Sequence, residues 1–342
     1  LDPDVDRVRY ENWPGESDGR DCVQEIEAID HRPDIGARMV VYDIEVATED
    51  EGFPKPERAV HPITSISAYD SYRDEYRLWG LASDSWERDT ETLTDDISAE
   101  LCERPDFPDD TAGGPTLADV TLFDDETQLL ESFHSWVLAC DPDIFTGYNA
   151  DGFDTPYLIQ RSYNVQALSI KRYTPTGNPG VWKETFEGNE QVNFSLSGRS
   201  TLDILDAYKK TQFRELDSYT LAAVADAELD YGKLDVDGDE LDTAWHERPV
   251  EFYAYSVRDT QATVGIEREA GLIDLFENLR RVTGARYERA VNNGPMLDTL
   301  FLRRAYEKGL VLPSNTEPDE TVFHGARVFD PVPGVHKNCV YP

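Results

Sequence analysis

The chain has 342 residues, of which 39% are apolar and 11% aromatic, enough to pack about two domains or one large one. Its 69 acidic residues outnumber the 32 basic ones, which gives a formal net charge of -37. This composition excludes a disordered or fibrous class, and no segment approaches the roughly 20 apolar residues of a membrane span.

Residues 1–36 are polar and irregular, and WPGESDGRD near their middle is typical of a loop. We expect this segment to be the remnant of an N-terminal domain. The first residues, LDPDVDRVRY, carry neither the positive charge nor the apolar segment of a signal peptide, and no initiator Met precedes them. The sequence therefore predicts a cytoplasmic protein, and we expect the chain to be a fragment of a longer one.

The segment RMVVYDIEV, residues 38–46, reads as a buried strand that contains two acids. Side chains alternate along a strand, so Asp43 and Glu45 share one face and Tyr42, Ile44 and Val46 the other. Two like charges about 4 Å apart cost roughly 4 kcal/mol at an effective dielectric of 20. A raised pKa, a basic partner or a bound cation must compensate them, unless they lie at an exposed sheet end and face water.

The next segments predict an alternation of strands and helices. ITSISAYDS and DEYRLWGL read as two strands of a meander, and the segment 84–118, rich in Asp, Pro and Gly, as a solvated insertion. A helix is predicted over 124–140, where Leu129, Leu130, Phe133, Trp136 and Val137 recur at helical spacing. DIFTGYN follows it as a short strand.

A second helix is predicted after residue 154, with Thr155 as its N-cap and Pro156 at its first position. The segment 171–199 resembles a hairpin, STLDILDAY reads as a strand, and SYTLAAVADAEL as a helix capped by Ser218. A long helix is predicted from residue 251. Strands that alternate with helices in this way predict a layered α/β domain.

Other motifs are weaker. DVDGDE at 235–240 resembles the start of a calcium loop but has Glu240 where Gly is needed and His246 where Glu is needed, so a solvated loop is favoured. GNPG at 177–180 reads as a turn. The four cysteines form no C-x-x-C pair and the six histidines no metal-ligand spacing, which favours free thiols and no zinc site.

Tyr255 and Asp259 are four residues apart on the long predicted helix and therefore share a face, although Asp259 could also pair with Arg258 or Arg268. The order of the signals is more specific than any one of them: DIE on a strand, then TGYNADGFDTPY, then YSVRD on a helix. This order resembles the proofreading 3'-5' exonuclease region of family B DNA polymerases, of the archaeal kind, in the variant with Tyr in the last motif.

The resemblance implies a ribonuclease H-like exonuclease domain over residues 37–270, with a mixed β-sheet flanked by helices. LDTLFLRRAYEKGLVLPS and FHGARVFDPVPGVHKNCVYP are similar to the segments that lead into the polymerase palm, so residues 271–342 would begin a truncated palm region. The polymerase active site would lie beyond the chain. FHGA occupies the place of a primer-strand motif, with Phe323 instead of Tyr and with Gly325, which weakens the role carried over there.

By the family pattern, two Mg²⁺ or Mn²⁺ ions are the cofactors. Asp43 would bridge both ions, Glu45 and Asp259 would hold the ion that activates water, and Asp154 would support the second ion through water. Tyr255 would orient the attacking water. Asn149 and Phe153 would contact the terminal nucleotide. The implied partners are the single-stranded 3' end of a DNA primer and the remainder of the polymerase chain, with a sliding clamp as a further candidate and no membrane.

An acidic balance normally argues against nucleic-acid binding, because phosphate neutralisation drives it. In molar salt the Debye length falls to about 3 Å, and the self-repulsion of an acidic surface is screened. With 8 Lys against 24 Arg, the sequence favours a salt-loaded cytoplasm over an ordinary acidic protein. Two other functions stay open: a catalytically silent primer-binding module, and a stand-alone exonuclease that acts on RNA.

Overall fold

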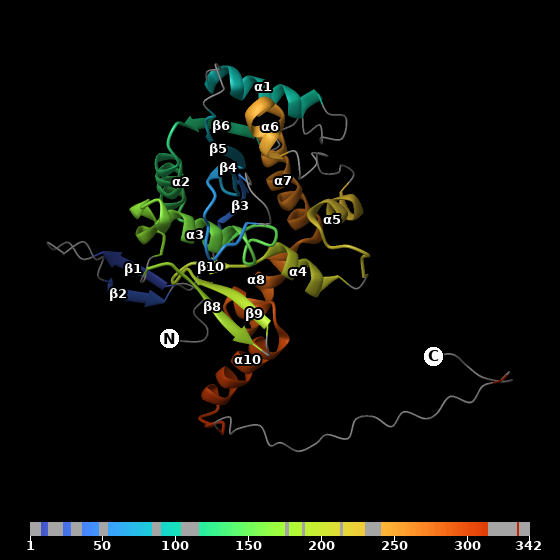
Figure 1. The fold of residues 1–342 in the computed structure, drawn as a ribbon. Helices are drawn as coiled ribbons and strands as arrows, with labels where there is room; N and C mark the ends of the chain where they lie inside the picture. The colour runs from blue at the N-terminus through green and yellow to red at the C-terminus, as the bar shows by residue number, and fades with distance from the viewer. Residues whose placement is uncertain are drawn as a thin grey trace.

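The computed structural model describes residues 8–12, 23–28, 36–47, 54–83, 90–103, 116–174, 178–186, 189–212, 215–229, 241–313 and 334. A six-stranded mixed sheet lies at its centre, with helices on both faces (Figure 1). In hydrogen-bonded order its strands are β10 (Ser200–Thr201), β7 (Ile144–Thr146), β3 (Met39–Val46), β4 (Ile63–Asp70), β5 (Glu75–Leu81) and β6 (Thr116–Phe123).

The predicted meander is confirmed, because β3 pairs antiparallel with β4 and β4 antiparallel with β5. In this register Asp43 stands opposite Ser67, and Glu45 opposite Ser65. β7 and β6 join the two sides of the meander as parallel strands. β7 pairs with β3 only as far as Val41, so the second half of β3 lies beyond the end of that neighbour.

One face of the sheet is covered by α2 (Glu126–Cys140), α3 (Asp154–Asn164) and the short 3-10 helix Leu168–Arg172. These helices bury Tyr42 and Ile44 of β3, together with the predicted apolar stripe of α2. Asp125 caps α2 by accepting a hydrogen bond from the backbone N–H of Gln128, 3.1 Å away. The predictions of this helix and of its buried face are confirmed.

The opposite face is crossed by α7 (Pro249–Ala270), which packs against β3, β4 and β5. Pro249 stands at the start of this helix, where its missing N–H is not needed, and Gly271 ends it in the left-handed conformation (φ 59°). Residues of α7 share a second core with Met39 and Val41 of β3. Around this core lie α4 (Ile204–Thr211), α5 (Leu221–Glu228), α8 (Leu272–Thr283) and α9 (Tyr287–Ala290). α6 (Leu241–Glu247) packs against α7 in a third core, and α10 (Asn293–Glu307) packs on α8 and α9.

Two hairpins stand outside the central sheet. The predicted hairpin is present as β8 (Gly180–Phe186) and β9 (Asn189–Ser195), and a further antiparallel pair consists of β1 (Val8–Asn12) and β2 (Val23–Ala28). Figure 1 shows α10 and the β8–β9 hairpin at the end of the molecule away from α1 (Thr90–Glu103). Among the described helices, none combines the length and the apolar character needed to cross a membrane.

Two predictions of secondary structure are wrong. The segment 84–118 is not simply a solvated insertion, because it contains α1, whose Leu93 and Ile97 are buried against α7, and the start of β6. The segment 200–208 is not one strand, because β10 ends at Thr201 and α4 begins at Ile204. Asp203 causes the change, since its carboxylate caps α4 by accepting from the backbone N–H groups of residues 205 and 206.

The predicted helix starts are displaced by one or two residues. α3 begins at Asp154 and its N-cap is Phe153, so Thr155 lies inside the helix. α5 is capped by Thr220, whose hydroxyl accepts from the backbone N–H of residue 223, instead of by Ser218. The calcium-like segment 235–240, Phe323 and Gly325 lie outside the described residues.

Candidate metal centre

The two acids of β3 lie on the face of the sheet that α7 covers. Asp43 and Glu45 alternate with Tyr42 and Ile44, whose side chains enter the core on the opposite face. Both acids are half-buried, so they do not simply face water at an exposed sheet end. Whatever balances their charge must therefore lie between β3 and α7.

α7 brings a third carboxylate to the same place. Asp43, Glu45 and Asp259 each offer a carboxylate oxygen, and these oxygens all lie within 4.8 Å of one another. Asp259 is almost fully buried. Arg268, one of its two conceivable basic partners, instead donates a hydrogen bond of 2.8 Å to Asp74. Three like charges thus converge from two elements that are more than 200 residues apart in the sequence.

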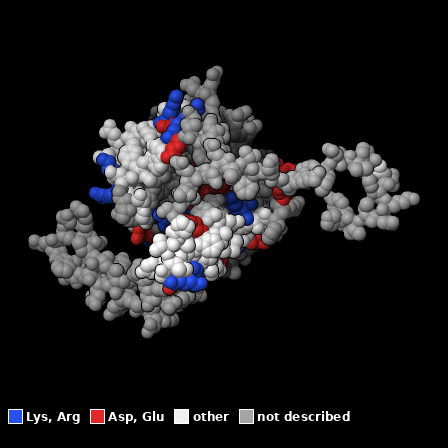
Figure 2. Space-filling view, turned by 90° about the horizontal axis from the view of Figure 1, so that it is seen from below, with Lys and Arg blue, Asp and Glu red and all other residues white. Residues whose placement is uncertain are grey.

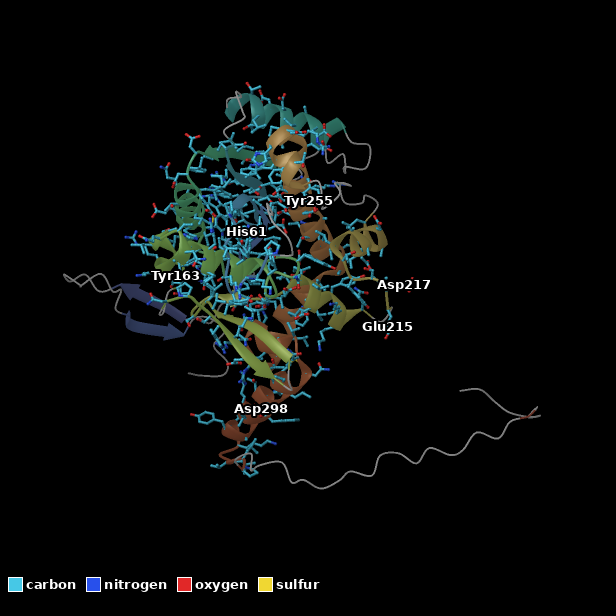
Figure 3. All side chains as sticks on the ribbon, viewed as in Figure 1. His61, Tyr163, Glu215, Asp217, Tyr255 and Asp298 are labelled. Carbon is cyan, nitrogen blue, oxygen red and sulfur yellow. The ribbon has the colours of Figure 1, made fainter. Side chains whose placement is uncertain are left out.

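Tyr255 completes this side of the centre. Figure 3 labels this side chain on α7. It lies one turn before Asp259, is buried, and is hydrogen-bonded to Asp259. Burial, followed by the charges of Asp259, Glu45 and Asp43, raises the pKa of the Tyr255 phenol far above its usual value. The phenol therefore keeps its proton and is a hydrogen-bond donor in this site.

The fourth predicted acid, Asp154, lies at the start of α3 and is not one of the three clustered carboxylates. Its Oδ1 accepts a hydrogen bond of 3.1 Å from the backbone N–H of Ile44, between the two acids of β3. That N–H lies in the part of β3 beyond the end of β7. Complete burial raises the pKa of Asp154, with smaller contributions from the charges of Asp203 and Asp259.

The loop before α3 carries the two predicted nucleotide contacts. Asn149 is exposed and has a left-handed backbone (φ 60°), and Phe153 is half-buried with its ring 5.3 Å from that of Tyr157. Gly147 permits the loop to approach β3, because a Cβ there would lie 2.4 Å from the carbonyl oxygen of Tyr42. This contact fixes where the loop leaves the sheet.

Sequence reasoning missed Asp203, which organises this loop. Its two carboxylate oxygens accept from the backbone N–H groups of Asn149 (3.1 Å) and Asp151 (2.9 Å) while it also caps α4. Burial raises the pKa of Asp203, and burial together with the charge of Asp203 raises that of Asp151 to about 7. An Asp directly before a helix is a typical N-cap, so Asp203 could have indicated the start of α4. We missed it because the segment was interpreted as a strand.

The donor set fits a hard divalent cation. Clustered carboxylate oxygens are the ligands that Mg²⁺, Mn²⁺ and Ca²⁺ prefer, and the described part of the cluster contains no thiolate or imidazole that would favour zinc. A cation between these oxygens would also remove their mutual repulsion. The geometry therefore accounts for a core strand that keeps two acids.

Comparisons with known proteins show the family to which the sequence is related. Residues 20–224 match the sequence profile described as DNA polymerase family B, exonuclease domain. The chain is 28% identical over 311 residues to a DNA-directed DNA polymerase of Escherichia phage RB69, which covers 88% of this chain and 33% of the relative. It is 29% identical over 236 residues to the DNA polymerase delta catalytic subunit of Drosophila melanogaster, which covers 65% of this chain and 21% of the relative.

An archaeal relative is also found. The DNA polymerase of Thermococcus litoralis is 25% identical over 233 residues, which covers 65% of this chain and 13% of the relative. The chain spans about a third of the length of the phage relatives it matches. All of these relatives are named as DNA polymerases. The profile match over residues 20–224 includes Asp43, Glu45 and Asp154 and ends before Asp259.

Proposed function

The chain belongs to DNA polymerase family B, and from this premise we propose that it removes 3'-terminal nucleotides from DNA by two-metal-ion hydrolysis, as a proofreading exonuclease. The observation that carries the proposal is the cluster of Asp43, Glu45 and Asp259, whose oxygens lie within 4.8 Å of one another. The relatives are polymerases, so a stand-alone exonuclease acting on RNA is not favoured. A silent primer-binding module would not need the assembled acids.

The four acids would hold two divalent ions, Mg²⁺ or Mn²⁺. When bound, such ions lower the pKa of water and stabilise the charge that develops on the attacking and leaving oxygens. Asp43 would contribute to both ions, Glu45 and Asp259 to one of them, and Asp154 to the other through water. The bond between Asp154 and the backbone of β3 supports this role, because it fixes the acid beside the strand.

Tyr255 would orient the attacking water. Its phenol keeps its proton throughout the neutral range, since burial and the neighbouring carboxylates raise its pKa. Its single O–H donates to Asp259, so the phenol oxygen would accept a hydrogen bond from the attacking water. A neutral phenol is too weak a base to remove the proton of that water, which suits a positioning group better than a general base. Asn149 and Phe153 would contact the terminal nucleotide, and the exposed amide and half-buried ring are consistent with that use. Phe323 and Gly325 would contact the primer strand.

The substrate would be the single-stranded 3' end of a primer, and the partner in the same chain would be the rest of a polymerase. We place an N-terminal remnant at 1–36, the ribonuclease H-like exonuclease domain at 37–270 and the start of the palm at 271–342. A sliding clamp is a further proposed partner. The proposed location is the cytoplasm, because an archaeal host of the kind proposed below has no nucleus to hold its replicating DNA.

We also propose an archaeal host with a salt-loaded cytoplasm. The support is the net charge of -37 and the ratio of 8 Lys to 24 Arg. Figure 2 shows basic and acidic side chains interspersed on one face of the described residues, so this face is not a uniformly positive surface for DNA. The melting temperature should rise with KCl into the molar range, because salt screens the self-repulsion. A melting temperature that is flat or falls between dilute and molar KCl would contradict this proposal.

A labelled oligonucleotide tests the nuclease itself. The chain should shorten 3'-tailed single-stranded DNA from its 3' end in molar KCl when Mg²⁺ is added, and stop when the metal is chelated. Replacing both Asp43 and Glu45 with Ala should abolish shortening while the fold persists, because the repulsion of the two acids is also removed. Cleavage that persists in this double variant, purified in parallel with the wild type, would refute the assignment.

A further inference from the structure

The part of the sheet that faces α7 beside the acids consists of small hydroxylated residues. Ser67 and Ser65 of β4 stand directly opposite Asp43 and Glu45 of β3. Directly opposed residues of an antiparallel pair point to the same face of the sheet, so these serines and the acids both face α7. Each acid thus has a serine as its cross-strand neighbour.

The two serines bind α7 through side-chain hydroxyl groups. The hydroxyl oxygens of Ser65 and Ser256 are 2.8 Å apart. Ser67 donates to the backbone carbonyl of Ser256 at 2.8 Å, and its hydroxyl oxygen lies 2.5 Å from that of Thr260. All four residues are at most 1% exposed. We call Ser65, Ser67, Ser256 and Thr260 the hydroxyl network.

The network and the metal centre occupy neighbouring stripes of one helix. Ser256 and Thr260 are four residues apart, and each directly follows a residue of the centre, Tyr255 or Asp259. Successive residues of an α-helix are separated by about 100° in rotation and 1.5 Å in height. A rotation or slide of α7 that breaks the network would therefore displace Asp259 from the acids of β3 by a similar amount.

Gly80 of β5 also lets α7 approach the sheet closely at Tyr253, about one helical turn before Ser256. A Cβ on Gly80 of β5 would lie 2.4 Å from the hydroxyl oxygen of Tyr253 and 2.7 Å from a methyl group of Leu122. The Tyr253 hydroxyl donates to the carbonyl of Leu81 at 3.1 Å. The helix is thus held at short range on the sheet by Gly80 and then by the hydroxyl network.

We propose that the hydroxyl network positions α7 so that Asp259 meets Asp43 and Glu45, and that it thereby sets the affinity of the centre for divalent cations. This inference rests on the proposed function, because it assigns a positioning role toward the same centre. Hydrogen bonds resist the mutual repulsion of the three carboxylates, which favours separation of α7 from β3. None of the four residues touches the metal or the substrate in this role.

The alternative is that the hydroxyl network only satisfies its own hydrogen bonds inside the core and does not position α7. This alternative predicts a different result. In that reading cation affinity follows overall stability, whatever the chemistry of the substitution. Positioning by hydrogen bonds predicts instead that affinity follows the hydroxyl. Two substitutions at Thr260 separate the cases, because Val keeps the shape and loses the hydroxyl, whereas Ser keeps the hydroxyl and loses a methyl group.

The experiment is a calorimetric titration of Mn²⁺ into the full chain in molar KCl, with urea unfolding measured on each protein. Thr260→Val should raise the Kd for Mn²⁺ about 3- to 10-fold, the loss expected for one buried hydrogen bond. Thr260→Ser should bind as the wild type does even where it unfolds more easily. Thr283→Val is the matched control, since Thr283 is buried on α8 and donates to the carbonyl of Leu279, away from the centre.

The outcomes separate this inference from the function on which it rests. If the wild type and Asp259→Ala bind Mn²⁺ equally, the metal centre itself is wrong and the inference falls with it. If the wild type binds more tightly than Asp259→Ala but Thr260→Val binds as the wild type does, only the positioning role is overturned. The positioning role is also overturned if, across the Thr260 variants and Thr283→Val, the Kd for Mn²⁺ rises in proportion to the loss of stability in urea.

Discussion

Replacing Asp43 with Asn should stabilise the metal-free protein and weaken its response to Mg²⁺. The substitution keeps the shape of the side chain and removes one of three negative charges. At the 4.8 Å limit of the cluster, each pair of carboxylates repels by about 3.5 kcal/mol at an effective dielectric of 20. Asp43 takes part in two such pairs, so the unscreened repulsion removed by the substitution is at least about 7 kcal/mol at this dielectric.

The measured gain should be much smaller than this unscreened repulsion. Asp43 and Glu45 are only half-buried, so water reaches them, and molar salt screens part of the interaction. A gain of about 1–3 kcal/mol in the free energy of unfolding is therefore expected in the presence of a chelator. Added Mg²⁺ should then stabilise the wild type, because it binds the folded protein and not the unfolded chain. It should stabilise the variant by less, because the variant has one ligand charge fewer.

The assay is urea unfolding at pH 7.5 in molar KCl, with EDTA and then with Mg²⁺, on the wild type and the Asp43→Asn variant. Asp95→Asn on α1 is a matched control, because Asp95 is an exposed acid that is not one of the three clustered carboxylates. A variant that is less stable than the wild type in EDTA, and that gains as much from Mg²⁺, would refute the electrostatic argument for a metal centre.

Three further predictions follow from single contacts. Asp259→Ala should lower the exonuclease rate by several orders of magnitude and weaken Mn²⁺ binding, whereas Tyr255→Phe should cost roughly 10²- to 10⁴-fold in rate with metal affinity nearly unchanged. Equal losses of Mn²⁺ affinity in a calorimetric titration would contradict this division. Complete burial lowers the pKa of His134 to about 3. The unfolded chain binds its proton near pH 6.5, so the free energy of unfolding should fall as the pH drops from about 6.5 toward 3, and His134→Gln should flatten this dependence in urea melts. An unchanged slope in the variant would oppose the assignment. Gly80→Ala should destabilise the fold by about 1–3 kcal/mol in the same assay, because the new methyl group would meet the Tyr253 hydroxyl, and a neutral result would show that α7 can move away.

Much of the central sheet could be predicted from the sequence because its signals are local. The apolar run of β3 and the helical spacing in α2 each lie within a single element. The errors arose where one residue changed the outcome or where acids dominated the composition. Asp203 ends a strand-like run because it caps α4. In the acidic segment 84–118, the overall polarity outweighed Leu93 and Ile97, whose side chains form the buried side of α1.

The grouping of Asp43, Glu45 and Asp259 is the part of the predicted site that the structure shows, and its geometry could not be read from the sequence. Alternation along β3 placed Asp43 and Glu45 on one face of the strand, and the i, i+4 spacing placed Tyr255 and Asp259 on one face of α7. That the two faces meet depends on the contacts of α7 with β4, which pair residues nearly 200 positions apart. The contact of Asp154 with β3 depends on where β7 ends, and no local pattern in the sequence encodes that end.

Anomalous scattering from bound Mn²⁺ tests the central claim most directly. Crystals grown in molar KCl would be soaked with Mn²⁺ and a short single-stranded DNA whose last linkage is a phosphorothioate, which slows cleavage. We predict two Mn²⁺ peaks about 3.5–4 Å apart, between Asp43 and Glu45 of β3 and Asp259 of α7, with the 3'-terminal linkage beside them. DNA bound at its 3' end with no Mn²⁺ peak among these three carboxylates would contradict the account.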